Sequence, residues 1–286
     1  MEERWFDVRT DRGVRLRARS VGDGPIDLVL HHGLASSQQI WDLMIPRLVG
    51  RCRVVTFDAR GHGRSAKPSS GYGFATTTAD LVAVVRAARL RRPIVAGHSW
   101  GAMVALEAVV RHPRTFAGAY LVDGGVTALS RDMTWAEAKI RLAPPHLDGM
   151  PVDAFRAAIP SFWDGAVRVT PEIEAMVLSL MRVDRDGGIH PRLHRSNHLR
   201  ILRAIWEQDP LGLHARLRVP AEALLTQGGG SAEAAWTAAK RRQARSIRAT
   251  GAPTHLVWVE GIHDIPLQQP ALVARRIGSF ARRAVG

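Results

Sequence analysis

The chain has 286 residues, 46% of them hydrophobic, which is enough for the core of one large domain or of a domain that carries an insertion. No apolar run approaches the length of a membrane span, and the charged amino terminus, residues 1–4, has no apolar stretch behind it. These features argue against a membrane-spanning or secreted protein, so we expect a cytoplasmic one. A single cysteine, Cys52, excludes an internal disulfide and a cysteine-based metal cluster.

The formal net charge is +14, and almost all of the positive charge comes from arginine, because lysine occurs only at positions 67, 139 and 240. The arginines are spread along the whole chain. The densest run, residues 240–248, lacks the interleaved aromatic residues typical of nucleic-acid-binding segments. We interpret this run as a solvated helix face, and we expect no specific nucleic-acid partner and no membrane partner. The sequence leaves the oligomeric state open.

Strand-like and helix-like segments alternate through the first half of the chain. Within residues 4–21, apolar side chains alternate with arginines, which indicates two edge strands with one buried face. Apolar runs and amphipathic stretches predict buried strands at 26–30, 53–57, 93–97 and 117–122, and helices at 37–48, 77–90 and 100–111. Thr77, followed three residues later by Asp80, resembles a capping box at the start of the second helix. The alternation predicts a parallel, doubly wound sheet.

The alternation stops between residues 130 and 218, where Thr134 and Thr170 mark helix starts but no convincing strand is visible. The pattern resumes with a strand at 221–226, a helix from Ser231, a strand at 254–259 and a final helix from about Pro270. The predicted fold class is α/β, with a doubly wound, mostly parallel eight-stranded sheet. We expect residues 1–129 and 219–286 to form this core and residues 130–218 to form a helical cap inserted after the sixth strand.

The pentapeptide Gly97-His98-Ser99-Trp100-Gly101 joins a predicted strand to a predicted helix and has the form of a nucleophile elbow. Such a turn is so sharp that only very small side chains fit two positions before and after the serine. It projects the serine hydroxyl above the sheet, and the N–H groups that open the helix point toward any oxyanion formed there. Taken alone, the pentapeptide also fits an ordinary turn before a buried helix.

Three further motifs follow other predicted strands in a consistent order. They are His32-Gly33, the segment 58–65 (Asp-Ala-Arg-Gly-His-Gly-Arg-Ser) and Gly261-Ile262-His263-Asp264. Together with the pentapeptide around Ser99, this set resembles the α/β-hydrolase superfamily, and within it the capped esterases, haloperoxidase-like enzymes and C–C hydrolases. The resemblance covers the entire chain and places the insertion at the usual position of the lid.

The resemblance implies a role for each matching residue. Ser99 would be the nucleophile and His263 the base that activates it. The main-chain N–H groups of Leu34 and Trp100 would form the oxyanion hole. Relatives that open epoxides or displace halide use an aspartate nucleophile, so a serine at position 99 disfavours those reactions.

The acidic member of the set is less obvious from the sequence. Many relatives carry it after the strand that follows the lid, but residues 226–231 contain no carboxylate. Some relatives place the acid one strand earlier, and Asp123 occupies that position here. We therefore assign the acid to Asp123, with Glu233 as the second candidate. Asp123 could also be a turn residue that binds backbone amides before two glycines.

Aromatic residues of the insertion suggest an apolar pocket. Trp135, Trp163 and Trp206, together with His32 of the core, are candidate substrate-binding residues. The sequence does not show which of these side chains face Ser99.

Three histidines, His190, His194 and His198, recur every four residues and could line one helical face. The zinc-binding helix of a metalloprotease requires a Glu directly after its first histidine, and His194 is not followed by one. We therefore expect no metal there.

The resemblance implies a serine hydrolase that cleaves carboxylic esters or lactones of hydrophobic small molecules through an acyl-enzyme, without cofactor or metal. Hydrolysis of C–C bonds, perhydrolysis and thioester chemistry would use the same three side chains and stay open as alternatives. A ligand-binding protein of this fold with little or no turnover is an alternative from another class.

Overall fold

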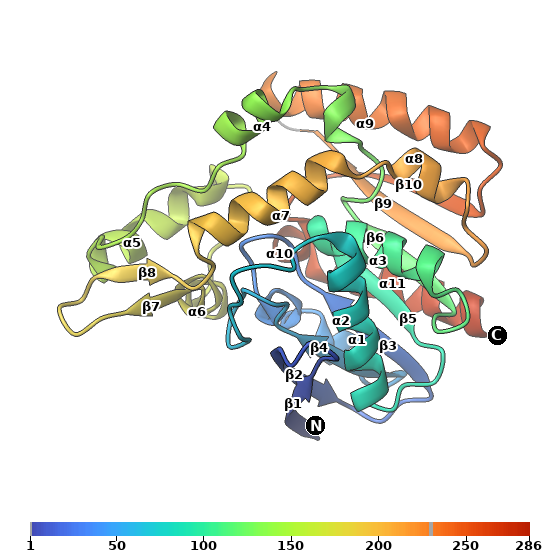
Figure 1. The fold of residues 1–286 in the computed structure, drawn as a ribbon, viewed down its shortest axis with the longest axis horizontal. Helices are drawn as coiled ribbons and strands as arrows, with labels where there is room; N and C mark the ends of the chain where they lie inside the picture. The colour runs from blue at the N-terminus through green and yellow to red at the C-terminus, as the bar shows by residue number, and fades with distance from the viewer. Residues whose placement is uncertain (1, 229–230) are drawn as a thin grey trace.

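The computed structural model describes residues 2–228 and 231–286, with the side chains of residues 231–233 outside the described part. Eight strands form one sheet in the order β1-β2-β4-β3-β5-β6-β9-β10 (Figure 1). The strand β2 pairs antiparallel with β1 and β4, and every other neighbouring pair is parallel. The predicted doubly wound, mostly parallel eight-stranded sheet is confirmed.

The bounds of the core elements follow the predicted segments closely. The strands are β1 Glu3–Arg9, β2 Arg15–Val21, β3 Ile26–His31, β4 Cys52–Phe57, β5 Ile94–His98, β6 Gly118–Val122, β9 Ala221–Gln227 and β10 Thr254–Glu260. The helices are α1 Ile45–Leu48, α2 Phe74–Ala87, α3 Trp100–Arg111, α8 Pro210–His214, α9 Ser231–Ala249, α10 Ile265–Gln268 and α11 Pro270–Val285, with a 3-10 turn η1 at Gln38–Trp41.

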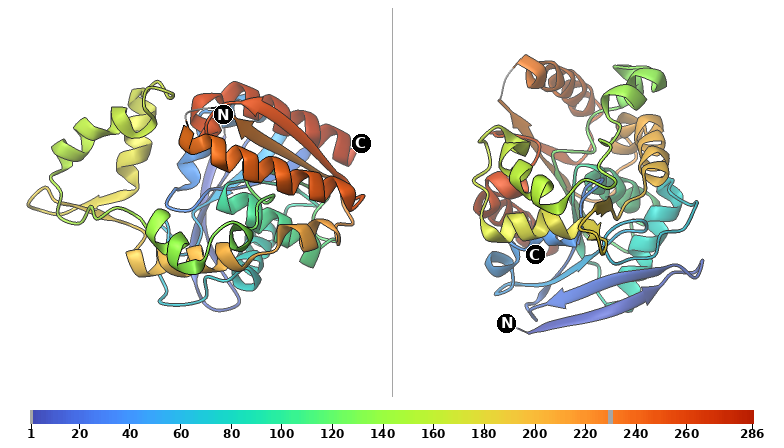
Figure 2. Two further views of the ribbon diagram at one scale, coloured as in Figure 1. Left: turned by 90° about the horizontal axis from the view of Figure 1, so that it is seen from above. Right: turned by 90° about the vertical axis from the view of Figure 1, so that its left-hand side faces the viewer.

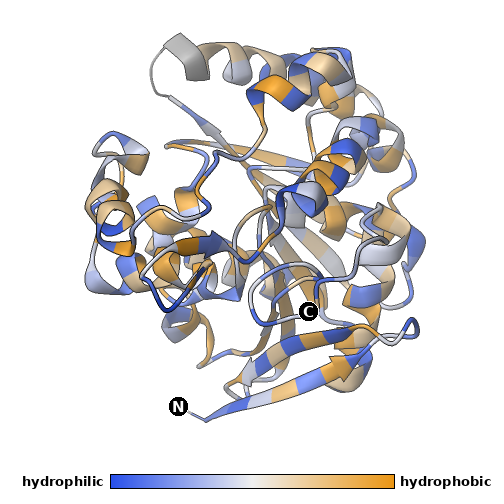
Figure 3. Ribbon diagram, turned by 60° about the vertical axis from the view of Figure 1, so that its left-hand side comes forward, coloured by the Kyte–Doolittle hydropathy of each residue, from blue (hydrophilic) through white to orange (hydrophobic). Residues whose placement is uncertain are grey.

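The central strands are apolar on both faces because each face carries a layer of helices. On β5, Val95 packs into the core on the side of α2, α3, α8 and α9. Its neighbours Ile94 and Ala96 pack into the opposite core with α1, α10 and α11. Successive side chains of a strand point to opposite faces, so both layers need apolar residues. By contrast, Figure 3 shows polar and apolar residues alternating along the two-stranded edge beside the amino terminus.

The segment between β6 and β9 is an insertion in the sheet, since these two strands pair directly. It contains α4 Trp135–Arg141, α5 Val152–Ala158, α6 Pro171–Ser179, α7 Arg195–Glu207, the strands β7 Met181–Val183 and β8 Ile189–Pro191, and the 3-10 turns η2 Leu129–Arg131 and η3 Ile159–Trp163. The helix α8 also lies in this segment, although it packs against α3 and α9 of the core. Figure 2 shows the part with α5, α6, β7 and β8 standing out to the side of the sheet core.

The helix starts predicted inside the insertion are confirmed, but the absence of strands is wrong. Thr134 and Glu137 form a reciprocal capping box at α4, and Thr170 caps α6. The strands β7 and β8 form a small antiparallel hairpin. Each has only three residues, too few for an alternating pattern to be visible in the sequence. The Asp184 carboxylate accepts N–H groups from the turn between them.

Two predictions near the first helices are corrected. The stretch 37–48 forms two short pieces, η1 and α1, instead of one helix. The helix α2 begins at Phe74, so Thr77 lies inside it, and the Thr77 hydroxyl donates to the Gly73 carbonyl. Asp80 does not serve as a capping residue because its buried carboxylate binds both nitrogens of the Arg60 guanidinium that face it.

The longest helices are amphipathic. In α11, Val273, Ala274, Ile277 and Phe280 are buried, at the spacing of one helix face. In α9, residues 241, 242, 245 and 248 are exposed arginines, as the predicted solvated face requires, whereas Lys240 is turned inward. Across residues 2–228 and 231–286, no helix combines the length and hydrophobicity needed to cross a membrane.

Candidate active site

Ser99 occupies a sharp turn between β5 and α3. Its φ of 55° lies in the left-handed region, which non-glycine residues adopt only when the surrounding structure holds them there. A Cβ atom on Gly97 would lie 2.1 Å from the Gly101 carbonyl oxygen, and one on Gly101 would lie 2.3 Å from the His31 carbonyl oxygen. Both glycines are therefore required by the close approach of β3, β5 and α3 at this turn.

The structure brings Ser99, His263 and Asp123 together in one hydrogen-bonded chain. The Nε2 atom of His263 lies 2.9 Å from the Ser99 hydroxyl oxygen, and its Nδ1 atom lies 2.7 Å from Oδ2 of Asp123. A carboxylate accepts hydrogen bonds, so Nδ1 carries a proton and Nε2 is left to accept the serine proton. The three side chains follow β5, β10 and β6, at the carboxyl ends of parallel strands.

Asp123 is held from several sides. Its side chain is only 2% exposed, and its φ of 43° is left-handed. Its Oδ1 atom accepts the Thr226 N–H at 2.9 Å and the Lys240 ammonium at 2.8 Å. Burial by itself raises the pKa of Asp123, but the hydrogen bond and charge of His263, together with Lys240, hold the pKa well below its ordinary value. Asp123 is therefore ionised at neutral pH.

His263 has a raised pKa. The surrounding protein desolvates the imidazole and by itself lowers the pKa of His263, but the hydrogen bond to Asp123 and its negative charge outweigh that effect. The ring remains 55% exposed, so it is open to the cavity described below. Behind it lies His98, whose Nε2 is 2.9 Å from the His263 carbonyl oxygen. Burial, and next the charge of His263, lower the pKa of His98 to about 4, so that ring is neutral.

Glu233 is the second candidate for the acid, and Asp264 is the carboxylate next to His263 in the chain. The side chain of Glu233 lies outside the described part of the chain. Asp264, next to His263, accepts a hydrogen bond of 2.8 Å from the indole of Trp163, so its carboxylate faces the insertion.

The backbone N–H groups of Leu34 and Trp100 lie beside Ser99, and both residues line the same cavity as the serine. Within the described residues, neither N–H group has a protein acceptor. Groups of this kind at the first position of a helix and in the neighbouring loop can bind an oxyanion.

His32 is a candidate substrate-binding residue that the structure places elsewhere. Its ring is fully buried, with Nε2 accepting the Ala59 N–H at 3.0 Å and Nδ1 lying 2.7 Å from the Gly33 carbonyl oxygen. Since Nε2 accepts, Nδ1 must donate. This hydrogen bond holds the Gly33 carbonyl toward the His32 ring. In a trans peptide the C=O and N–H groups point in opposite directions, so the Leu34 N–H of the same peptide points away from His32. His32 thus orients the loop, and its side chain is not among those that line the cavity over Ser99.

A cavity of about 570 Å³ lies over Ser99. Its apolar walls come from both the core and the insertion, and among them are Leu34, Trp100, Met103, Leu129, Leu142, Leu202, Ile205, Leu225 and Trp236. Polar groups are few and include Ser99, His263, Asp123, His198 and Lys240. This composition suits an apolar small molecule with one reactive polar group.

The cap tryptophans predicted to bind substrate do not line this cavity in the part of the chain that the structure describes. The indole of Trp206 donates to the Met133 carbonyl and packs against Trp135, with ring centroids 6.2 Å apart. Trp163 donates to Asp264, as described above. The tryptophans on the cavity wall are instead Trp100 of α3 and Trp236 of α9. Composition could not separate Trp236 from the three cap tryptophans, because all four occur in helix-like segments of similar pattern.

The three histidines at four-residue spacing do not share a helix face. His190 lies in β8, His194 is the residue before α7, and His198 lies within α7. His198 lines the cavity, and its Nε2 is 3.2 Å from the Leu142 carbonyl oxygen. Among the described residues, no group of three or more His, Cys, Asp or Glu is arranged to hold a metal ion.

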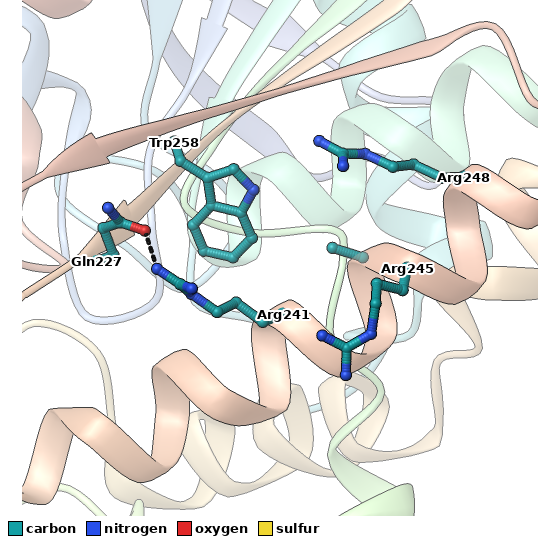
Figure 4. Close-up of a pocket in the computed structure, with 6 residues that line it drawn as sticks. Gln227, Arg241, Arg245, Arg248 and Trp258 are labelled. Carbon is teal, nitrogen blue, oxygen red and sulfur yellow. Dashed lines mark hydrogen bonds between the residues drawn. The ribbon is translucent and has the colours of Figure 1, made fainter.

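A second cavity, of about 340 Å³, lies between α9 and the edge strand β10 (Figure 4). Its walls are Gln227, Trp258, Ala244 and three arginines of α9, at positions 241, 245 and 248. Arg241 bonds the Gln227 side chain and stacks on Trp258. These walls provide no nucleophile and no base, so the cavity over Ser99 is the candidate active site.

Comparison with known proteins agrees with this geometry. A family model of the alpha/beta hydrolase fold matches residues 28–165. The 2-(acetamidomethylene)succinate hydrolase of Mesorhizobium japonicum is 26% identical over 192 residues, which is 66% of each chain. A non-heme chloroperoxidase of Streptomyces lividans is 35% identical over 159 residues, 53% of each chain. The matched stretches thus span about half to two thirds of these relatives.

Solved structures extend the likeness in fold to nearly the whole chain. E-2-(acetamidomethylene)succinate hydrolase superposes with a TM-score of 0.77 at 21% identity and covers 98% of this chain and 100% of the other. The enol-lactonase of Burkholderia xenovorans gives 0.74 at 18% identity, with 97% and 100% covered. With the sheet order, the turn at Ser99 and the family match in agreement, the chain has the α/β-hydrolase fold.

Proposed function

We propose that this protein is a serine hydrolase that cleaves a carboxylic ester or lactone of a hydrophobic small molecule through an acyl-enzyme. The observation that carries the proposal is the hydrogen-bonded chain Ser99–His263–Asp123 at the floor of an apolar cavity. A serine hydroxyl is a weak nucleophile unless a positioned base removes its proton, and His263 lies where that base is needed.

In the proposed reaction, the Ser99 oxygen attacks the substrate carbonyl carbon while Nε2 of His263 takes the hydroxyl proton. Asp123 stabilises the resulting imidazolium through Nδ1, and the N–H groups of Leu34 and Trp100 bind the oxyanion. Collapse expels the alcohol, which takes the proton from His263, and leaves the acyl group on Ser99. Water then attacks the acyl carbon with the same histidine as base, which releases the acid and restores the serine. No step calls for a cofactor.

The proposal includes a division of labour between two parts of the chain. Residues 1–129 and 219–286 carry the reacting groups, and we propose that residues 130–218 act as a cap. Support comes from the cavity wall, to which the insertion contributes Leu142, His198, Leu202 and Ile205. The apolar side chains of this wall would select an apolar acyl or lactone portion.

Perhydrolysis is the alternative that a specific observation favours, because a non-heme chloroperoxidase is among the relatives with 35% identity. In that reaction hydrogen peroxide, in place of water, would attack the acyl-enzyme and release a peracid. The acyl-enzyme is common to both reactions, so the two differ only in the nucleophile that the cavity admits in the second half.

The test uses p-nitrophenyl acetate and p-nitrophenyl butyrate with the full chain. We expect turnover that falls to the background rate in Ser99→Ala, while the exposed-site control Ser246→Ala keeps the parent rate. A fluorophosphonate should add to Ser99 and to no other residue when peptides are analysed by mass spectrometry. Two results together would contradict the proposal: binding of the esters without formation of product, and no fluorophosphonate labelling between pH 6 and 9. The protein would then be a ligand-binding protein without hydrolase activity.

A further inference from the structure

Lys240 departs from the rest of its arginine-rich run. The arginines that follow it on α9, at positions 241, 242, 245 and 248, are exposed, whereas the Lys240 side chain is only 15% exposed and reaches across to the end of β6. Its ammonium lies 2.8 Å from Oδ1 and 3.1 Å from Oδ2 of Asp123. It also lies 3.0 Å from the carbonyl oxygen and 2.9 Å from the hydroxyl oxygen of Thr226.

These contacts use the whole hydrogen-bonding capacity of the ammonium. A lysine has three N–H donors, and four oxygen atoms of Asp123 and Thr226 surround it. Binding a substrate anion would therefore require breaking bonds to a buried carboxylate. Although Lys240 lines the cavity, its geometry is that of a group directed at Asp123, and the cavity keeps its apolar character.

We propose that Lys240 is a positioning residue for the reaction: it holds the Asp123 carboxylate against His263 and weakens, by its positive charge, the attraction between that carboxylate and the protonated imidazole. The inference rests on the proposed function, since it assigns a role at the same site. It explains how Asp123 can lie at the end of β6 and still present Oδ2 to Nδ1 of His263. Thr226 N–H and Lys240 together fix Oδ1, and the other oxygen is then left facing the histidine.

The electrostatic part follows from the charges that face His263. Asp123 approaches from the end of β6, and Asp264 lies in the loop after β10 that also carries His263. Both negative charges favour the protonated ring of His263. Lys240 approaches from α9 and opposes it, and His98, from β5, is neutral. Removing the ammonium while Asp123 stays ionised therefore leaves the imidazolium more stable, so the pKa of His263 should rise.

The size of the rise follows from Coulomb's law. The Nζ atom of Lys240 and the Nδ1 atom of His263 lie 3.1 Å and 2.7 Å from the same oxygen, Oδ2 of Asp123, so they are within about 6 Å of each other. Two unit charges at that distance interact weakly when one of them is half exposed to water, so we expect the pKa of His263 to rise by about half a pH unit to one unit. Loss of one of the two groups that fix Oδ1 should also reduce the plateau of kcat/KM, roughly tenfold. A merely structural lysine would change stability without moving the pKa.

The experiment compares Lys240→Met with Lys240→Arg and with Arg245→Met, which removes a charge from the next turn of the same helix. The pKa of His263 is measured directly by NMR titration of histidine-labelled protein, with the signal assigned through His263→Gln. In parallel, the pH dependence of fluorophosphonate labelling at Ser99 is recorded. We expect Lys240→Met to raise the pKa and move the labelling profile to higher pH, and both other variants to keep the parent values.

An unchanged pKa of His263 in a folded Lys240→Met protein would overturn the proposal, as would an equal shift in Arg245→Met. Thermal melting followed by circular dichroism shows whether the variant is folded. If Lys240→Met fails to fold, Lys240→Gln keeps a donor to Asp123 without the charge and must show the same rise. The NMR titration needs no turnover, so a protein without hydrolase activity would contradict the proposed function and leave this test intact.

Discussion

Asp123→Asn should damage the protein in two separable ways. The exchange removes a negative charge from a side chain that is 2% exposed, where it balances the ammonium of Lys240 and orients the imidazole of His263. The variant therefore places an uncompensated positive charge beside the end of β6. It also offers His263 an amide that can donate to Nδ1, which favours the tautomer with the proton on the wrong nitrogen.

The two losses can be estimated from these contacts. Removing one partner of a buried ion pair costs about 3–5 kcal/mol in the free energy of unfolding, and we expect the lower end because Lys240 keeps both oxygens of Thr226. Asp123 has a depressed pKa, so its stabilising effect is present at neutral pH and fades as the pH falls below about 4. The wrong histidine tautomer should lower kcat by about four powers of ten.

The double variant Asp123→Asn with Lys240→Met separates the two effects. Without the ammonium, no charge is left uncompensated, so the free energy of unfolding should recover most of the loss, while kcat stays low because the histidine still lacks its carboxylate. Urea denaturation at pH 7 measures the first quantity, and hydrolysis of p-nitrophenyl butyrate measures the second.

Two results would refute this reasoning. If Asp123→Asn retained turnover within about tenfold of the parent, the acid would have to lie elsewhere, and Glu233→Gln would be examined next. If the destabilisations of the two single variants simply added in the double variant, Asp123 and Lys240 would not be energetically coupled, and the contacts between them would be worth little.

Three further results are expected. The rate on p-nitrophenyl butyrate needs a neutral His263, whose pKa is raised, so kcat/KM should fall as the pH drops through a midpoint above about 6.5; a midpoint below 6 would contradict the role of Asp123. Asp80→Asn should cost about 3–5 kcal/mol in urea denaturation because Arg60, 3% exposed, loses its buried partner; a loss under 1 kcal/mol would be inconsistent with that pair. Gly97→Ala should cost about 3 kcal/mol or more, whereas the control Gly50→Ala, with open space around it, should melt near the parent temperature.

Local patterns in the sequence were sufficient for most of the fold. The elements around Ser99 are short apolar runs closed by Gly, Asp or His, and the predicted bounds of β3, β4, β5, β6, β9 and β10 agree with the structure within about two residues. The placement of Asp123 was also predictable. It follows a parallel strand, so it must lie at the same edge of the sheet as Ser99 and His263, which follow other parallel strands. Its bond to His263 follows from that topology together with the loop after β10.

The orientation of individual side chains was not predictable in the same way. Trp206 and Trp236 have similar local surroundings in sequence, but only Trp236 lines the cavity, because α9 and α7 present different faces to Ser99. Lys240 lies in a run that has every local property of a solvated face. Its inward direction depends on Asp123 and Thr226, which are 117 and 14 residues away in the chain. Helical periodicity carries no information about such distant partners.

The register of the sheet explains how Asp123, the proposed catalytic acid, can be carried by β6. β6 and β9 are neighbours, and the Asp123 N–H donates to the Leu224 carbonyl, so the end of β9 lies directly beside Asp123. Thr226, near the position that carries the acid in many relatives, provides an N–H to Oδ1 and two oxygens to Lys240. The strand after the insertion therefore still takes part in holding the carboxylate. Moving the acid by one strand changes which backbone carries it, while the carboxylate itself stays within reach of Nδ1 of His263.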